Sequence, residues 1–354
     1  MTTILQEHLS DAEPLLAVRD LDVQYRIAER DVDLVKGVSF DVGVGEIVCL
    51  VGESGSGKSL TANALLGLLR RNKRMTVRGR LEFEGSDLNT ISNGSLRKVQ
   101  GREIGMIFQN PASALDPVIP IGKQIAEAVA RRRTERADIR RRVIELVDWV
   151  GISDPEQRVK QFPHEISGGM CQRAAIAIAL AGDPKLLIAD EPTTALDVTI
   201  QAQILALLKQ IRDDRRMSVL LITHDMGVAA QTADRIIVMY AGSIVEAGPT
   251  KEFFAHAGHP YSIGLINAVP RVDGARARRF SAIPGSMPEA RNRPEGCAFH
   301  PRCSIASDRC REETPELRQT GTQLTACHRA DEMLSGLVKP WSTQAVVPLP
   351  GGVT

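Results

Sequence analysis

Short apolar runs along this chain predict strands. Two segments alternate apolar and polar positions, residues 38–42 and 81–85, and this alternation is typical of half-buried strands. A strand with its turn is expected at residues 15–20 and 22–26. More continuous apolar runs indicate buried strands. These runs are residues 46–51, 103–109, 186–190, 218–223 and 235–240, and the last is expected to form a hairpin with residues 243–246.

Other apolar positions recur at helical spacing. Between residues 121 and 151 they repeat every three or four positions, which predicts a helical insert. We interpret the basic stretch from Arg131 to Arg142 within it as a solvated helix face. Strands that alternate with helices indicate an α/β fold whose parallel sheet is covered on both faces. The other helices are expected at residues 60–69, 170–181, 198–212 and 250–256.

The composition excludes several classes of protein. The chain has 354 residues, 43% of them hydrophobic and 25% charged, which is ordinary globular composition. The formal net charge of +1 provides no basic field, so no nucleic-acid partner is expected. No apolar run approaches the roughly 18–20 residues that cross a bilayer. Residues 1–14, an expected flexible N-terminus, lack the basic and apolar regions of a signal peptide. We therefore expect a cytosolic chain.

The segment Gly52–Ser59 fits the phosphate-binding pattern GxxxxGK[ST]. It lies between an expected strand and an expected helix, which argues against a chance glycine turn. Glycines let backbone N–H groups approach phosphate oxygens closely, and the helix start adds a positive dipole end. Lys58 can reach the β- and γ-phosphates, and the Ser59 hydroxyl can bind Mg²⁺. The residues expected at the nucleotide are Gly52, Ser54, Gly55, Ser56, Gly57, Lys58, Ser59 and Leu60.

Two adjacent acids, Asp190 and Glu191, follow the apolar run at 186–190. An aspartate at the end of such a strand can hold Mg²⁺, and the next carboxylate can polarise an attacking water as a general base. Acids at strand ends are common, but downstream of a phosphate loop the pair indicates nucleotide hydrolysis.

The segment Ile166–Met170 contains Ser167-Gly168-Gly169 and precedes Asp190 by about twenty residues. It resembles the LSGGQ signature of the ATP-binding cassette (ABC) ATPases. The rest of the family's set is present in the family's order. Tyr25 matches the aromatic residue that stacks on adenine, Gln109 the Q-loop glutamine, Ala195-Leu196-Asp197 the D-loop, and His224 the switch histidine.

The resemblance implies an α/β fold of the P-loop NTPase type: a RecA-like core with an antiparallel β subdomain and a helical signature subdomain at about 112–170. It implies Glu191 as the base, His224 at the γ-phosphate, and Mg²⁺ at Ser59, Gln109 and Asp190. Taken alone, His224 could be a structural histidine, and Gln109 could merely cap a turn. In this family Ser167, Gly168, Gly169 and Asp197 serve the ATP of a facing cassette.

Further segments resemble one subfamily, the ATPases that energise di- and oligopeptide import. Met170 replaces the usual signature Gln, as in that subfamily. Phe108–Pro111 with Ala114–Pro117 resembles its FQ-P-SLNP stretch, Phe162–Glu165 its YPHE, and His259–Tyr261 its HPYT. From about Leu16 to His328 the chain closely resembles the D-type ATPase of the dipeptide/oligopeptide permeases.

Four of the six cysteines, Cys297, Cys303, Cys310 and Cys327, cluster near the C-terminus. In a cytosolic chain such a cluster indicates metal binding before disulfides. Four thiolates suffice for zinc or a [4Fe-4S] cluster. The spacing lacks CxxC pairs, and members of the resembled family can hold an iron–sulfur cluster here, so [4Fe-4S] is favoured, with zinc and free thiols as alternatives. His300 and His328 are lower-ranked ligands.

The sequence therefore predicts an ATPase, using ATP and Mg²⁺, that energises di- or oligopeptide import. It is expected to lie peripherally on the cytoplasmic face of the cell membrane. The resemblance implies as partners a second, F-type ATPase, two permease subunits and a substrate-binding protein. The alternatives are nickel or glutathione as cargo, a non-transport ABC ATPase, and a metal-binding regulator.

The expected organisation has four parts. Residues 1–14 are flexible, 15–258 form the nucleotide-binding domain, 259–330 form a small separate Cys-rich appendage, and 331–354 form a disordered tail.

Overall fold

A computed structural model of the chain describes residues 13–110, 114–132, 135–194, 197–269 and 283–340. Among these residues, no helix is long and apolar enough to cross a bilayer.

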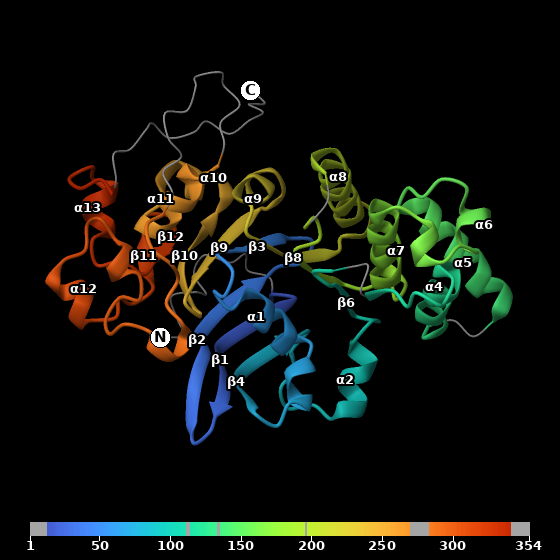
Figure 1. Ribbon diagram of the computed structural model, residues 1–354, viewed down its shortest axis with the longest axis horizontal. Coiled ribbons are helices and arrows are strands. Elements are labelled where there is room, and N and C mark those ends of the chain that lie inside the picture. Colours follow the sequence, from blue (N-terminus) through green and yellow to red (C-terminus); the bar gives the residue numbers. More distant parts are fainter. Residues whose placement is uncertain (1–12, 111–113, 133–134, 195–196, 270–282, 341–354) are drawn as a thin grey trace.

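An eight-stranded sheet forms the centre of the molecule, in the order β11-β12-β10-β9-β3-β8-β7-β6 (Figure 1). The five strands from β9 to β6 are parallel, and β10, β12 and β11 add an antiparallel edge. The predicted parallel core is thus confirmed. The strands are β3 (Ile47–Val51), β6 (Ile104–Ile107), β7 (Leu186–Asp190), β8 (Ser218–Thr223), β9 (Arg235–Tyr240), β10 (Ser243–Pro249), β11 (Arg318–Thr320) and β12 (Gln323–Thr325).

Successive residues of a strand point to opposite faces of a sheet, and in the central sheet the residues on both faces are buried. Val48 and Leu50 of β3 join the hydrophobic core shared with the antiparallel sheet. Cys49 and Val51 join a second core that includes apolar residues of the helices on the other face. This two-sided burial explains why the parallel strands read as continuous apolar runs.

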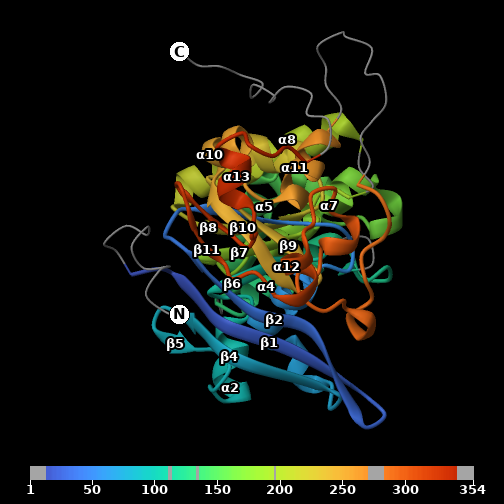
Figure 2. The same ribbon diagram turned by 90° about the vertical axis from the view of Figure 1, so that its left-hand side faces the viewer.

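The second sheet is antiparallel, with the order β2-β1-β4-β5, and lies below the central sheet in Figure 2. The two expected segments 15–20 and 22–26 form one long strand, whose pairing with β2 shifts register between Val18 and Leu21. Its strands are β1 (Leu16–Ile27), β2 (Arg30–Val42), β4 (Met75–Phe83) and β5 (Ser86–Asp87).

Each segment predicted to be helical contains a helix, and the structure has further short helices that the apolar periodicity did not indicate. The predicted helix at 250–256 is matched by α10. The helices are α1 (Lys58–Leu65), α2 (Asn93–Val99), α4 (Ile121–Ala130), α5 (Arg136–Trp149), α6 (Pro155–Arg158), α7 (Gly168–Leu180), α8 (Val198–Arg215), α9 (Met226–Thr232), α10 (Thr250–His256), α11 (Pro260–Asn267), α12 (Asp308–Glu312) and α13 (Ala330–Leu334).

The helical insert is confirmed as α4 and α5, which pack on each other and on α7. Its basic stretch is solvated only in part. Arg140 and Arg141 are exposed, but Arg142 is buried and its Nη2 lies 2.6 Å from Oδ1 of Asp183. The solvated-face interpretation is therefore wrong for Arg142, which ties α5 to the turn before β7.

The C-terminal region is not the separate appendage that the sequence suggested. Its β12 pairs with β10 at Glu246–Thr325, so it extends the central sheet. Phe299 is buried in the same hydrophobic core as the central strands, and Cys297 and Cys303 pack against that core. Helix α13 occupies residues that were expected to begin a disordered tail. Residues 341–354 of that tail, and residues 1–12, lie outside the described part.

Candidate functional site

The phosphate loop connects β3 to α1, as predicted. Gly52 has φ 152°, and a Cβ there would lie 2.3 Å from the carbonyl oxygen of Met239 on β9. Gly57 caps the start of α1 with φ 106°. These two conformations are available to glycine at little cost, so the glycines permit both the turn and the close approach of β9.

Lys58 points back into its own loop. Its Nζ donates to the carbonyl oxygens of Gly52 and Glu53 at 2.7 and 2.9 Å, and lies 3.3 Å from Oγ of Ser56. Burial lowers the pKa of Lys58, against the opposing effect of nearby carboxylates such as Asp190. The ammonium is therefore held among oxygens inside the loop.

Ser59 and Asp190 meet at the carboxyl end of the sheet. The Ser59 hydroxyl donates to Oδ1 of Asp190 at 3.1 Å, although the residues are 131 positions apart. Burial raises the pKa of Asp190, and the hydrogen bond from Ser59 opposes this rise. A hydroxyl and a carboxylate side by side are oxygen donors of the kind Mg²⁺ prefers, so these two residues fit the ion.

Glu191 accepts three hydrogen bonds. The donors and their distances are Gln109 Nε2 at 2.9 Å, Thr194 Oγ1 at 2.9 Å and His224 Nδ1 at 3.1 Å. Burial raises the pKa of Glu191, but the bonds from Thr194, His224 and Gln109 outweigh burial and lower it overall. Glu191 also has a left-handed backbone, φ 48°, which turns it out of the line of β7. The carboxylate is thus kept ionised next to Asp190.

The structure thus brings together six predicted residues. These are Lys58, Ser59, Asp190, Glu191 and the two donors to Glu191, Gln109 and His224. Gln109 was expected beside Mg²⁺ with Ser59 and Asp190. Its amide instead donates to Glu191.

Other predicted site residues lie on separate elements. Ser167 caps α7 by accepting from the Met170 N–H at 3.3 Å, and a Cβ on Gly168 would meet open space. Gly169 faces Ile200 of α8. Helix α7 packs with α4 and α5, whereas α1 packs with β1, β2 and β7.

Asp197 accepts from Ile200 N–H at the start of α8, and Ala195 and Leu196 lie outside the described residues. Tyr25 is half-buried on β1. Ser54 and Gly55 line an open cavity of about 390 Å³ with residues of β1, β2 and the segment 287–291, and Tyr25 is not among its lining residues. Leu60 packs against the core shared with the antiparallel sheet.

The four C-terminal cysteines do come together. Cys297, Cys303, Cys310 and Cys327 line one cavity of about 10 Å³, together with His300 and His328. Burial raises the pKa of Cys297 to about 11 and that of Cys327 to about 12. Within the described residues, however, no three His, Cys, Asp or Glu are arranged to hold a metal ion. The donor types fit a cluster, but their arrangement does not.

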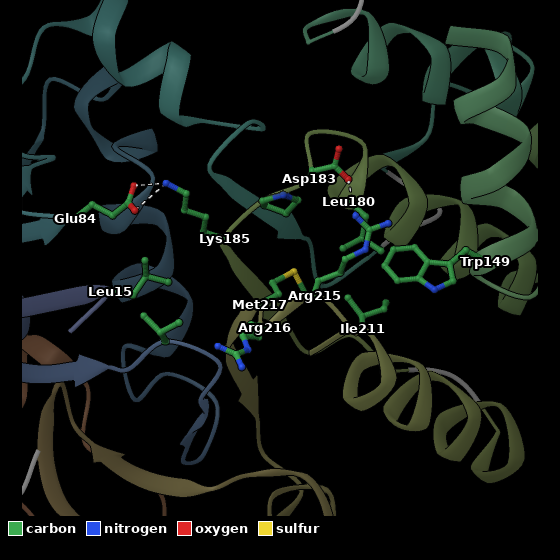
Figure 3. A pocket seen from close by; sticks show the side chains of 12 residues that line it. Leu15, Glu84, Trp149, Leu180, Asp183, Lys185, Ile211, Arg215, Arg216 and Met217 are labelled. Atoms are coloured by element: carbon green, nitrogen blue, oxygen red, sulfur yellow. Dashed lines mark hydrogen bonds and ion pairs between the residues drawn. The ribbon is translucent and has the colours of Figure 1, made fainter. Parts of the chain in front are cut away.

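A cavity of about 280 Å³ is lined by side chains that include Trp149, Asp183 and Arg215 (Figure 3). Lys185 and Met217 line it at the beginnings of β7 and β8, whereas the phosphate loop follows the end of β3, and these strands are parallel. The cavity therefore lies at the opposite end of the parallel strands from the phosphate loop. Arg215 lies over the Trp149 ring there, 5.0 Å from its centroid, and pairs with Asp183.

Two residues that hold the phosphate loop were missed by the sequence analysis. Arg302 pairs with the Glu53 carboxylate, and the Tyr261 hydroxyl accepts from the Glu53 N–H at 2.8 Å. Thr194, whose hydroxyl donates to the Glu191 carboxylate, was also missed. Its place three residues after Glu191 was the one available signal.

Comparisons with known proteins agree with this arrangement. The family model described as "ABC transporter" matches residues 35–194, and the model "Oligopeptide/dipeptide transporter, C-terminal region" matches residues 245–310. The oligopeptide transport ATP-binding protein OppD of Bacillus subtilis is 46% identical over 304 residues, which cover 86% of this chain and 85% of that protein. OppD of Mycobacterium bovis is 46% identical over 325 residues; they cover 91% of this chain, which spans only 53% of that relative's length.

Among solved structures, the ATP-binding cassette MJ0796, in a dimeric post-hydrolysis state bound to ADP and Pi, matches with a TM-score of 0.60 at 27% identity. The match covers 66% of this chain and 98% of that one. CbiO1 of Clostridium perfringens matches with a TM-score of 0.59 at 26% identity, over 72% of this chain and 95% of that one. The chain belongs to the ATP-binding proteins of the ABC transporter family, in the branch that carries the oligopeptide/dipeptide transporter C-terminal region.

Proposed function

We propose that this chain binds and hydrolyses ATP to energise the import of di- or oligopeptides through a membrane transporter. The observation that carries the proposal is the group formed by Lys58, the Ser59–Asp190 pair and the triply hydrogen-bonded Glu191. The membership of the chain in the peptide-transport branch of the family supports the cargo class.

In this proposal the chain's residues act mainly by positioning and by charge. Lys58 and the loop N–H groups bind the phosphates. Ser59 and Asp190 hold Mg²⁺, which when bound neutralises charge on the β- and γ-phosphates. Glu191, kept ionised by its three donors, accepts a proton from the attacking water, and His224 and Gln109 hold Glu191 in place.

The dimeric state of the MJ0796 relative supports a second part of the proposal. Ser167, Gly168 and Gly169 are exposed or half-exposed at the start of α7, with room above Gly168, so they can face a phosphate of another cassette. Asp197 would lie between the two sites, and Tyr25 would contact the adenine. The partners would be an F-type ATPase, two permease subunits and a substrate-binding protein, with the chain on the cytoplasmic face of the membrane.

The test is Glu191→Gln in the assembled complex. Loss of a general base costs about 10²–10⁴ in rate, so steady-state hydrolysis should fall by that range while ATP binding persists. Glu316→Gln, at an exposed position in the C-terminal region, is the matched control. Unchanged hydrolysis in Glu191→Gln would remove Glu191 as the base.

Cargo is tested separately. Binding assays on the partner substrate-binding protein with peptides, nickel and glutathione distinguish the peptide proposal from the other two cargoes. If no permease co-purifies with this chain, a non-transport ATPase becomes the better interpretation.

We also propose the four clustered cysteines as ligands of a [4Fe-4S] cluster, with zinc as the alternative. Their shared cavity supports the proposal, although the thiols would have to rearrange around a metal. Protein purified without oxygen should contain iron and sulfide. A colourless sample without either ends the cluster proposal, and measured zinc supports the alternative.

A further inference from the structure

Glu53, the second residue of the phosphate loop, is held from outside the loop by the C-terminal part of the chain. The two Glu53 carboxylate oxygens accept from Arg302 Nη1 and Nη2 at 2.8 and 3.0 Å. The Glu53 N–H donates to the Tyr261 hydroxyl at 2.8 Å. The side chain and the backbone of one loop residue are thus fixed by residues 208 and 249 positions away.

Arg302 is itself fixed firmly. Its side chain is only 6% exposed, and its Nε donates to the Pro284 carbonyl oxygen at 2.8 Å. The guanidinium also lies near the rings of Tyr240 and Phe299, 5.8 and 5.9 Å from their centroids. A two-bond guanidinium–carboxylate pair that is partly buried, as here, has a better defined geometry than an exposed ion pair.

An aromatic cluster supports both contacts. Tyr240, Tyr261 and Phe299 pack against one another with ring centroids 4.7 to 5.4 Å apart. All three are at most 1% exposed. Because Phe299 and Arg302 belong to the same short turn, the position of the C-terminal region determines where Arg302 meets the loop.

The contact continues from Glu53 to the phosphate-binding lysine. The Glu53 carbonyl oxygen accepts from Lys58 Nζ at 2.9 Å and from the Ser56 N–H at 3.2 Å. A displacement of Glu53 would therefore move an acceptor of Lys58 and a turn of the loop together.

We propose that Arg302 and Tyr261 are positioning residues for the phosphate loop, so that nucleotide affinity depends on the C-terminal region. The inference rests on the proposed function, because it assumes that Gly52–Ser59 binds ATP. They do not touch the phosphates in this proposal. They hold the loop in its binding conformation before ATP arrives, which removes an ordering cost from binding.

The experiment measures ATP affinity and the thermal unfolding midpoint of the full-length chain for Arg302→Met, Glu53→Gln and the double variant. Each single change should weaken ATP binding about tenfold, the effect of losing one charge-assisted hydrogen-bonded contact. The double variant should bind no more weakly than either single one, because both remove the same contact. Arg302→Lys should recover part of the affinity.

The matched control is Arg318→Met, which removes a half-buried arginine of the same region that pairs with Asp331 and lies outside the phosphate loop. It should leave ATP affinity unchanged. If Arg302→Met does not fold, Tyr261→Phe removes only the hydroxyl at Glu53 and should still weaken binding.

The proposal is overturned if Arg302→Met and Tyr261→Phe keep wild-type affinity, or if the Arg302 and Glu53 variants lower only the unfolding midpoint. Absence of ATP binding in the wild-type chain would instead overturn the proposed function itself, so the two failures are distinguishable.

Discussion

Glu246 offers a quantitative prediction because its carboxyl group is fully buried. It lies on β10 and accepts from the Gly258 and His259 N–H groups at 2.5 and 3.2 Å. Burial raises the pKa of Glu246 from 4.5 to about 7, against the effect of these hydrogen bonds. The neighbouring His259 is also buried, which lowers its pKa to about 3 and keeps it neutral through the range of the experiment.

The magnitude follows from linkage. One pKa unit corresponds to about 1.4 kcal/mol, so a rise from 4.5 to about 7 corresponds to about 3 kcal/mol. Because the folded pKa of Glu246 is the higher one, the folded chain binds more protons than the unfolded chain between these values. Its stabilising contribution is therefore complete below about pH 4.5 and is lost as the pH rises through about 7.

Glu246→Gln removes this titration and keeps an oxygen that can accept from Gly258. We expect the variant and the wild type to be similarly stable near pH 5, and the variant to be more stable by about 3 kcal/mol at pH 8. Urea unfolding followed by circular dichroism from pH 5 to 8.5 measures this difference. Glu312→Gln, at an exposed position, controls for the loss of one charge. A stability difference between Glu246→Gln and wild type that does not grow with pH would refute the reasoning.

Three further predictions concern the nucleotide site. Gly52→Ala should lower ATP affinity more than tenfold or prevent folding, because its Cβ would lie 2.3 Å from the Met239 carbonyl oxygen. A nucleotide titration checks this, with Gly37→Ala as the control, since a Cβ at Gly37 meets no atom within 4 Å. Asp190→Asn should raise the Mg²⁺ concentration needed for half-maximal hydrolysis about tenfold or more, with Mg²⁺-free ATP binding retained. Gly168→Asp has room for its side chain, so the unfolding midpoint should be unchanged. In the assembled complex the added carboxylate would face a phosphate of the other cassette and repel it, so hydrolysis should fall at least tenfold there and not in the isolated chain.

The elements best predicted from the sequence were those whose apolar pattern is set by burial on both faces. Residues 186–190 and 218–223 match β7 and β8 completely. The pairing of β12 with β10 was not predictable in this way. Strands of three residues carry too little pattern, and their pairing partner lies about eighty positions earlier in the chain. The composition shift after residue 258 suggested a domain boundary there. The hydrogen bonds between β10 and β12 join residues on the two sides of that boundary.

For the site, the sequence could predict residue types at fixed offsets from a glycine loop and from strand ends. It could not predict which of them touch. The family resemblance assigned Gln109 to Mg²⁺, whereas in the structure its amide donates a hydrogen bond to the Glu191 carboxylate. Arg302 gave no signal, because an arginine beside a cysteine motif looks like any other charge until the fold places it 2.8 Å from Glu53.

The two proposals about the C-terminal region share one residue and remain separable. Phe299 lines the cysteine cavity and also packs against Tyr240 and Tyr261, so a metal that moved the thiols would press on the aromatic cluster behind Arg302. The Arg302–Glu53 pair itself contains no cysteine. Loss of Arg302 and loss of the cysteine ligands are therefore separate perturbations. If a cluster is present, its effect would be to change an existing contact, and its removal should alter ATP affinity in wild type but not in Arg302→Met.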